Sequence, residues 1–77
     1  MTAYERKLNE IVDEIFGAFK DWTLQEIADA SKLALSTVWK IEQRYTKLPR
    51  FKTVFQLARA AGYRLEVTLD KRMRLHA

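Results

Sequence analysis

The sequence contains no cysteine, one histidine, one proline and two glycines among its 77 residues. The absence of cysteine excludes a disulfide scaffold, thiolate catalysis and cysteine-based zinc sites. His76 alone offers no partner for acid–base or metal chemistry, so we expect no enzyme, no metal and no cofactor. No apolar run approaches the roughly 20 residues that span a bilayer, so we expect a cytoplasmic protein with no membrane partner.

The scarcity of glycine and proline also excludes a low-complexity chain. Hydrophobic residues make up 48% of the sequence and charged residues 31%, a balance typical of folded, helical proteins. A chain of this length is expected to form one domain, which we assign to residues 1–77.

Acidic residues are few in the middle of the chain. Residues 1–31 carry three Lys or Arg against seven Asp or Glu, whereas residues 32–59 carry seven against one. A basic segment next to an acidic one is typical of a nucleic-acid-binding face with a solvated back. Basic surface is common, however, so charge alone does not separate this function from an ordinary solubilising surface.

Apolar residues spaced by three and four predict two helices in the first part of the chain. Thr2 and Glu5 form a capping-box pattern that begins a helix running to about residue 19. Its apolar stripe consists of Leu8, Ile11, Val12, Ile15, Phe16 and Phe19. Thr23 and Glu26 repeat the pattern and begin a short helix, whose buried face is Leu24, Ile27 and Ala28.

Two further helices are predicted in the basic segment. The pattern breaks at residues 31–33 and resumes with Leu35, Val38 and Ile41. A loop at residues 45–50 follows, because Pro49 cannot continue a helix. The fourth helix is expected over residues 51–61, with Phe51, Val54, Leu57, Ala58 and Ala61 inward. Gly62 then ends it, since glycine adopts positive φ readily.

After Gly62 the apolar spacing becomes alternating, which predicts a strand over about residues 64–69. With no second strand expected in the chain, its edges would pair with another copy, through a dimer interface of Leu65, Val67 and Leu69. The alternation continues to Leu75, which favours one long strand. A hairpin that turns at Asp70 and Lys71 and returns through Met73 and Leu75 remains the alternative.

An ordered set of motifs between Thr23 and Leu65 resembles the phage Cro and repressor family, also called the xenobiotic-response-element type. The matching elements are Gln25-Glu26-Ile27-Ala28, Ser36-Thr37-Val38, Lys40-Ile41-Glu42, Pro49 and Leu57-Ala58-Arg59-Ala60-Ala61-Gly62. The resemblance implies a mainly α, four-helix, lambda-repressor-like domain. It places the helix-turn-helix at residues 23–44 and implies a C-terminal β-strand used for dimerisation. The sequence departs from the family at Lys32, where glycine is usual, and at Ala34, where Ser or Thr usually caps the next helix.

The outward face of the second helix of this pair is the expected base-reading surface. With Val38 and Ile41 inward, a rotation of about 100° per residue leaves five side chains outward. These are Leu35, Ser36, Trp39, Lys40 and Gln43. Ordinary solvated surface is the alternative for Lys40 and Gln43, and packing against the preceding helix is the alternative for Leu35.

In the resembled family the loop after this helix lies along the DNA backbone, which implies phosphate contacts from its polar and basic residues. The expected contacts, including two at the start of the preceding helix, are Thr23, Gln25, Arg44, Thr46, Lys47, Arg50 and Lys52. A merely solubilising loop is the alternative. Glu42 is expected to pair with a nearby arginine rather than to read bases.

The resemblance implies a transcriptional regulator that binds double-stranded DNA as a homodimer on a palindromic operator. The alternative is an antitoxin that neutralises a cognate toxin protein and autoregulates its operon. A structural interaction module that binds no DNA is a third possibility. Co-purification of a second protein separates the first two, and a salt-dependent mobility shift excludes the third.

Overall fold

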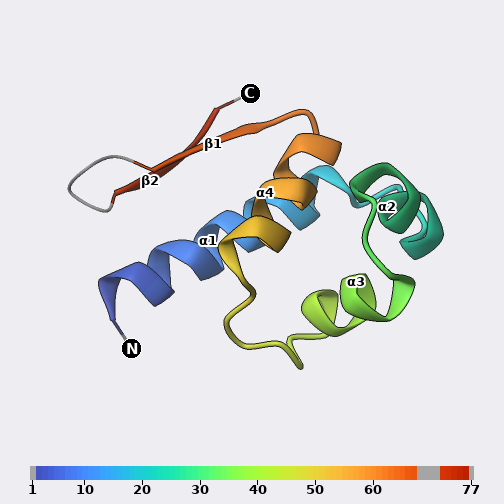
Figure 1. The fold of residues 1–77 in the computed structure, drawn as a ribbon, viewed down its shortest axis with the longest axis horizontal. Coiled ribbons are helices and arrows are strands. Elements are labelled where there is room, and N and C mark those ends of the chain that lie inside the picture. The colour runs from blue at the N-terminus through green and yellow to red at the C-terminus, as the bar shows by residue number, and fades with distance from the viewer. Residues whose placement is uncertain (1, 68–71, 77) are drawn as a thin grey trace.

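A computed structural model of the chain, which describes residues 2–67 and 72–76, contains four helices and a two-stranded antiparallel sheet (Figure 1). The elements are α1 (Ala3–Ala18), α2 (Leu24–Ser31), α3 (Leu35–Glu42), α4 (Phe51–Ala60), β1 (Arg64–Val67) and β2 (Met73–His76). The predicted mainly helical class is therefore confirmed, with one more strand than expected. Among the described residues, no helix has both the length and the apolar character needed to cross a membrane.

The first two helices begin where their capping patterns predict. Thr2 caps α1 by accepting the backbone N–H of Glu5 at 3.1 Å. At α2 the capping box is complete, because Thr23 accepts the N–H of Glu26 and the Glu26 carboxylate accepts the N–H of Thr23, at 3.1 and 2.9 Å. A side-chain cap contributes about 1 kcal/mol. α3 lacks one, since its N-cap residue is Ala34.

Three helices end in the same way, with a left-handed residue followed by a backbone bond that closes the last turn. The left-handed residues are Lys32, Arg44 and Gly62, with φ of 60°, 63° and 87°. The closing bonds run from Leu33 N–H to Ala28 O, from Tyr45 N–H to Lys40 O and from Tyr63 N–H to Ala58 O. The positive φ predicted at Gly62 is confirmed. At Lys32 and Arg44, side-chain sterics make this conformation cost about 1 kcal/mol or more.

The core lies where the helices meet, and α2 packs against both α3 and α4. Its buried side chains are Leu8, Ile11, Val12, Ile15, Phe19, Ile27, Ala28, Val38, Ile41, Val54, Leu57, Ala58, Leu65 and Met73. The prediction for Phe51 was wrong, because this side chain is 40% exposed. Phe51 is the first residue of α4, and its ring lies beside that of Phe55, 6.2 Å away between centroids, instead of entering the core.

The favoured prediction of one long strand without a partner in the chain was also wrong, and the pairing expected for the alternative hairpin is confirmed in the described residues. β2 runs antiparallel to β1, with Leu65 opposite Leu75 and Val67 opposite Met73. Pairing within the chain is favoured because closing a short connection costs little entropy and both segments share the same alternation. The predicted turn residues, Asp70 and Lys71, and the last residues of the predicted strand lie outside the described part of the chain.

Candidate nucleic-acid interface

The outer face of α3, together with its C-cap residue Gln43, carries all five residues predicted to read bases. Val38 and Ile41 are buried in the core, which leaves the opposite side of the helix accessible. The exposed residues there are Leu35, Ser36, Trp39, Lys40 and Gln43. Leu35 and Trp39 are 44% and 42% exposed, so each presents part of its apolar surface to solvent. The structure thus brings hydrogen-bonding and apolar side chains together on one short helix.

An aromatic stack extends this face beyond the end of α3. The ring of Tyr45 stacks on that of Trp39, with centroids 5.2 Å apart and planes inclined by 22°. Tyr45 is 70% exposed and was not among the predicted site residues. Helical spacing gave no indication of it, because the left-handed turn at Arg44 redirects the chain. The only indication in the sequence was that Tyr45, like Trp39, is an aromatic residue close to the basic loop.

Arg44 is committed to a contact within the chain. Its guanidinium forms an ion pair with Asp13 of α1, and both side chains are substantially exposed. Within the described residues Glu42 forms no ion pair with an arginine, so that prediction was wrong. Glu42 instead accepts a hydrogen bond from the Gln43 amide at 3.1 Å. Sequence reasoning missed the Asp13 contact because the two residues lie far apart in the chain.

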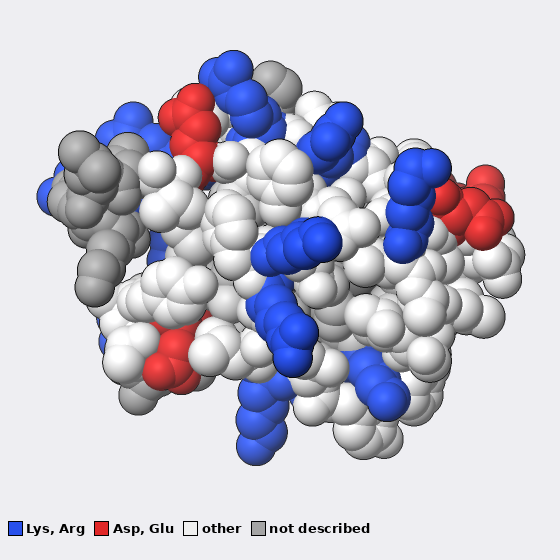
Figure 2. All heavy atoms as spheres, viewed as in Figure 1, with Lys and Arg blue, Asp and Glu red and all other residues white. Residues whose placement is uncertain are grey.

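Four other cations around α3 and the following loop form no ion pair within the described residues. We call them the basic rim: Lys40, Lys47, Arg50 and Lys52, all exposed. Thr46, predicted beside them, is half-buried, and its N–H donates to the Lys40 carbonyl at 3.2 Å. Figure 2 shows Lys and Arg side chains across the middle of one face, with Asp and Glu towards its edges. Unpaired cations raise the local potential and attract anions.

The start of α2 offers less than predicted. The backbone N–H of Thr23, a group that could contact a phosphate, donates to the Glu26 carboxylate within the capping box. The Gln25 amide donates to Asp29 at 2.8 Å. Both residues are exposed, and an acid lies beside the Gln25 side chain. A phosphate contact through the Thr23 N–H or the Gln25 side-chain amide would require these bonds to rearrange.

The residues predicted for the dimer interface differ in exposure, and only some of them lie in the described part of the chain. Leu65 is 5% exposed and belongs to the core of its own chain, so it is not a surface residue. Val67 is 51% exposed. Leu69 lies outside the described residues. The correction for Leu65 has a simple cause: pairing with β2 turns this side chain onto the helices.

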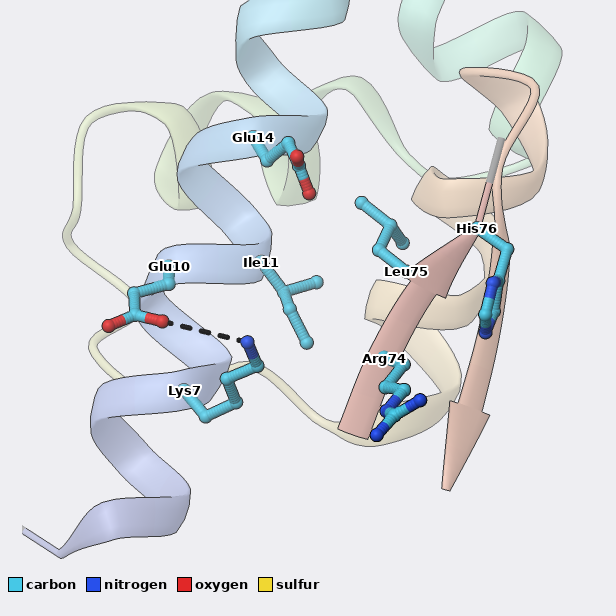
Figure 3. A pocket seen from close by; sticks show the side chains of 7 residues that line it. All are labelled: Lys7, Glu10, Ile11, Glu14, Arg74, Leu75 and His76. Carbon is cyan, nitrogen blue, oxygen red and sulfur yellow. Dashed lines mark ion pairs between the residues drawn. The ribbon is translucent and has the colours of Figure 1, made fainter. Parts of the chain in front are cut away.

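A hollow of about 440 Å³ between α1 and β2 differs from the α3 surface in its charge (Figure 3). Its lining residues are Lys7, Glu10, Ile11, Glu14, Arg74, Leu75 and His76. Lys7 lies 3.8 Å from Glu10, and His76 lies 3.2 Å from Glu66. Two acids, Glu10 and Glu14, line the α1 side of this hollow and Arg74 lines the β2 side, so its electrostatics do not favour a polyanion. Comparisons with protein-family models, with curated proteins and with solved structures each found no match.

Proposed function

We propose that this protein is a sequence-specific DNA-binding regulator of transcription, with α2 and α3 acting as a lambda-repressor-like helix-turn-helix. The observation that carries the proposal is the unpaired basic rim around the exposed outer face of α3. A helix of this kind fits the major groove of duplex DNA, which is about 12 Å wide. Binding rather than catalysis is the proposed activity.

Base reading is proposed for the polar side chains of α3. Lys40 can donate to O6 and N7 of guanine, and the Ser36 hydroxyl can donate or accept. Gln43 reaches a base only after its amide leaves the Glu42 carboxylate. Breaking this hydrogen bond costs little free energy, because the Gln43 and Glu42 side chains are both exposed and water can replace the bond.

Phosphate binding is proposed for the other three residues of the basic rim. Lys47, Arg50 and Lys52 flank Pro49, whose burial anchors the loop against the domain. Each phosphate that they neutralise releases condensed counterions, which favours binding at low salt. The acidic residues of α1, including Glu10 and Glu14, would repel phosphates, so in this proposal α1 faces solvent.

We further propose that two copies bind a palindromic operator. A two-fold pair places equivalent helices in successive major grooves, roughly 34 Å apart. The exposed side chain of Val67 on β1 is the proposed dimer contact, in place of the buried Leu65. The hairpin contributes Leu65 and Met73 to the core, so a dimerisation test must change its surface rather than delete it.

Selection of bound sites from a random DNA pool tests the proposal directly. We expect a two-fold symmetric consensus. Lys40→Ala should then weaken binding to the best site by ~1–3 kcal/mol and barely affect binding to random duplex. Lys20→Ala, an exposed lysine just beyond α1, is the matched control and should change neither. The proposal fails if the pool yields no enriched sequence, and an equal loss on both DNAs reassigns Lys40 to the backbone.

A further inference from the structure

Three exposed apolar side chains form a continuous surface on and beside α3. Leu35, Trp39 and Tyr45 are 44%, 42% and 70% exposed, and we call them the apolar ridge. Leu35 and Trp39 lie one helical turn apart, where side chains are neighbours. The ring of Tyr45 stacks on Trp39. Exposed apolar patches rimmed by polar residues mark interaction sites.

The ridge is arranged before any partner binds. The N–H of Tyr45 donates to the Lys40 carbonyl at 2.8 Å, which closes the last turn of α3. This closure requires the left-handed conformation of Arg44, whose guanidinium is paired with Asp13. The Tyr45 ring is therefore held against Trp39 by the backbone turn rather than by chance contact, and little ordering remains to be done on binding.

The surroundings of the ridge indicate the chemistry of its partner. Ser36 and Lys40 alternate with the ridge along α3, and the basic rim carries no ion pair within the described residues. An acidic protein surface would satisfy the cations, but the interleaved hydrogen-bonding groups favour base edges. The apolar group that base edges present in the major groove is the C5-methyl of thymine.

We propose that the apolar ridge reads thymine methyl groups, so that the preferred duplex carries thymines within each half-site. This inference rests on the proposed DNA-binding function and names its substrate class. It also assigns Tyr45 as a specificity-determining residue. Trp39 contributes mainly as the platform on which Tyr45 lies.

Replacement of single thymines by deoxyuridine in the selected operator tests the proposal, because it removes only the methyl group. Binding of the wild-type protein should weaken about fourfold per contacted methyl, the effect of one buried methyl or methylene group. Deoxyuridine outside the half-sites should have no effect. The wild-type protein supplies this result, so it does not depend on how any variant folds.

Variants then identify the residues. Leu35→Ala and Tyr45→Ala should each reduce the discrimination between thymine and deoxyuridine, while Tyr45→Phe keeps the ring and should preserve it. Trp22→Phe is the control, since Trp22 is another partly exposed tryptophan, 40% accessible and packed on Phe19. It should retain full discrimination.

Two outcomes overturn the inference in different ways. Tight binding of the selected operator with equal affinity for thymine and deoxyuridine refutes methyl reading and leaves the DNA-binding function intact. That result, together with unchanged DNA binding by Tyr45→Ala, would instead match a ridge that serves a protein partner. Absence of specific DNA binding by the wild-type protein removes both proposals.

Discussion

The basic rim and Arg44 should differ sharply in how they affect the salt dependence of DNA binding. Lys47, Arg50 and Lys52 of the rim and Arg44 belong to the basic segment, and all were expected from the sequence to contact phosphates. The structure separates them, because Lys47 and Arg50 have no ion-pair partner in the described residues whereas Arg44 is paired with Asp13. We therefore predict that the double variant Lys47→Ala/Arg50→Ala flattens the salt dependence, and that Arg44→Ala does not.

The size of the effect follows from counterion release. Each phosphate contact contributes about −0.9 to the slope of log affinity against log salt concentration. Loss of two contacts in each protomer of a dimer should make the slope less steep by about 3.6. Between 50 and 200 mM salt, the wild type should consequently lose roughly 150-fold more affinity than the double variant. Arg44→Ala removes a charge that Asp13 already balances, so its slope should match that of the wild type.

Fluorescence anisotropy of a labelled operator across this salt range provides the measurement. The variant Arg6→Ala/Lys20→Ala is the matched control, because it also removes one arginine and one lysine that are exposed and form no ion pair within the described residues. Thermal unfolding by circular dichroism verifies that each variant is folded. An unchanged slope in the Lys47/Arg50 variant would remove the loop from the interface. An equal flattening by Arg44→Ala would show that its pair with Asp13 opens on DNA.

Three further predictions concern stability and assembly. Lys32→Gly should stabilise the fold by about 0.5–1 kcal/mol in urea unfolding, because it relieves a left-handed residue at some cost in chain entropy; a less stable variant would contradict this. Leu57→Ala should destabilise by ~2–5 kcal/mol in the same assay, since Leu57 is fully buried, and a loss below about 1 kcal/mol would refute its place in the core. Val67→Glu should weaken dimerisation in sedimentation experiments without unfolding the chain, whereas Ala30→Glu, an exposed substitution on α2, should not. Identical association constants for the two variants would exclude Val67 from the dimer contact.

Features determined by neighbouring residues were predictable from the sequence. The capping box at Thr23 needs only the residue three positions on, and the end of α4 needs only Gly62. The exposure of Lys40 follows from helical rotation relative to Val38. Each of these features is determined by residues within about one helical turn, so it can be predicted without knowing how distant segments pack.

Features that join distant segments were not predictable in the same way. Alternating apolar residues indicate a strand but not which strand pairs with it, so the pairing of β1 with β2 was only the less favoured of two alternatives. The pair between Asp13 and Arg44 depends on how α1 and α3 are placed. The stack of Tyr45 on Trp39 depends on a left-handed arginine, which the sequence disfavours. The Asp13–Arg44 ion pair and the Trp39–Tyr45 stack are also the contacts that distinguish the surface around α3 from a merely basic one.

The docking of β2 against α1 has a consequence for the order of folding. Contacts of α2 with α3 are between neighbours along the chain, whereas β2 packs on α1 from the opposite end of the described residues. Contacts between such distant segments form slowly, because loop-closure entropy is lost before they stabilise the chain. We expect the helices to be associated in the transition state and the sheet to join afterwards. Substitutions at Met73, a buried residue of β2, should then accelerate unfolding and leave the folding rate nearly unchanged.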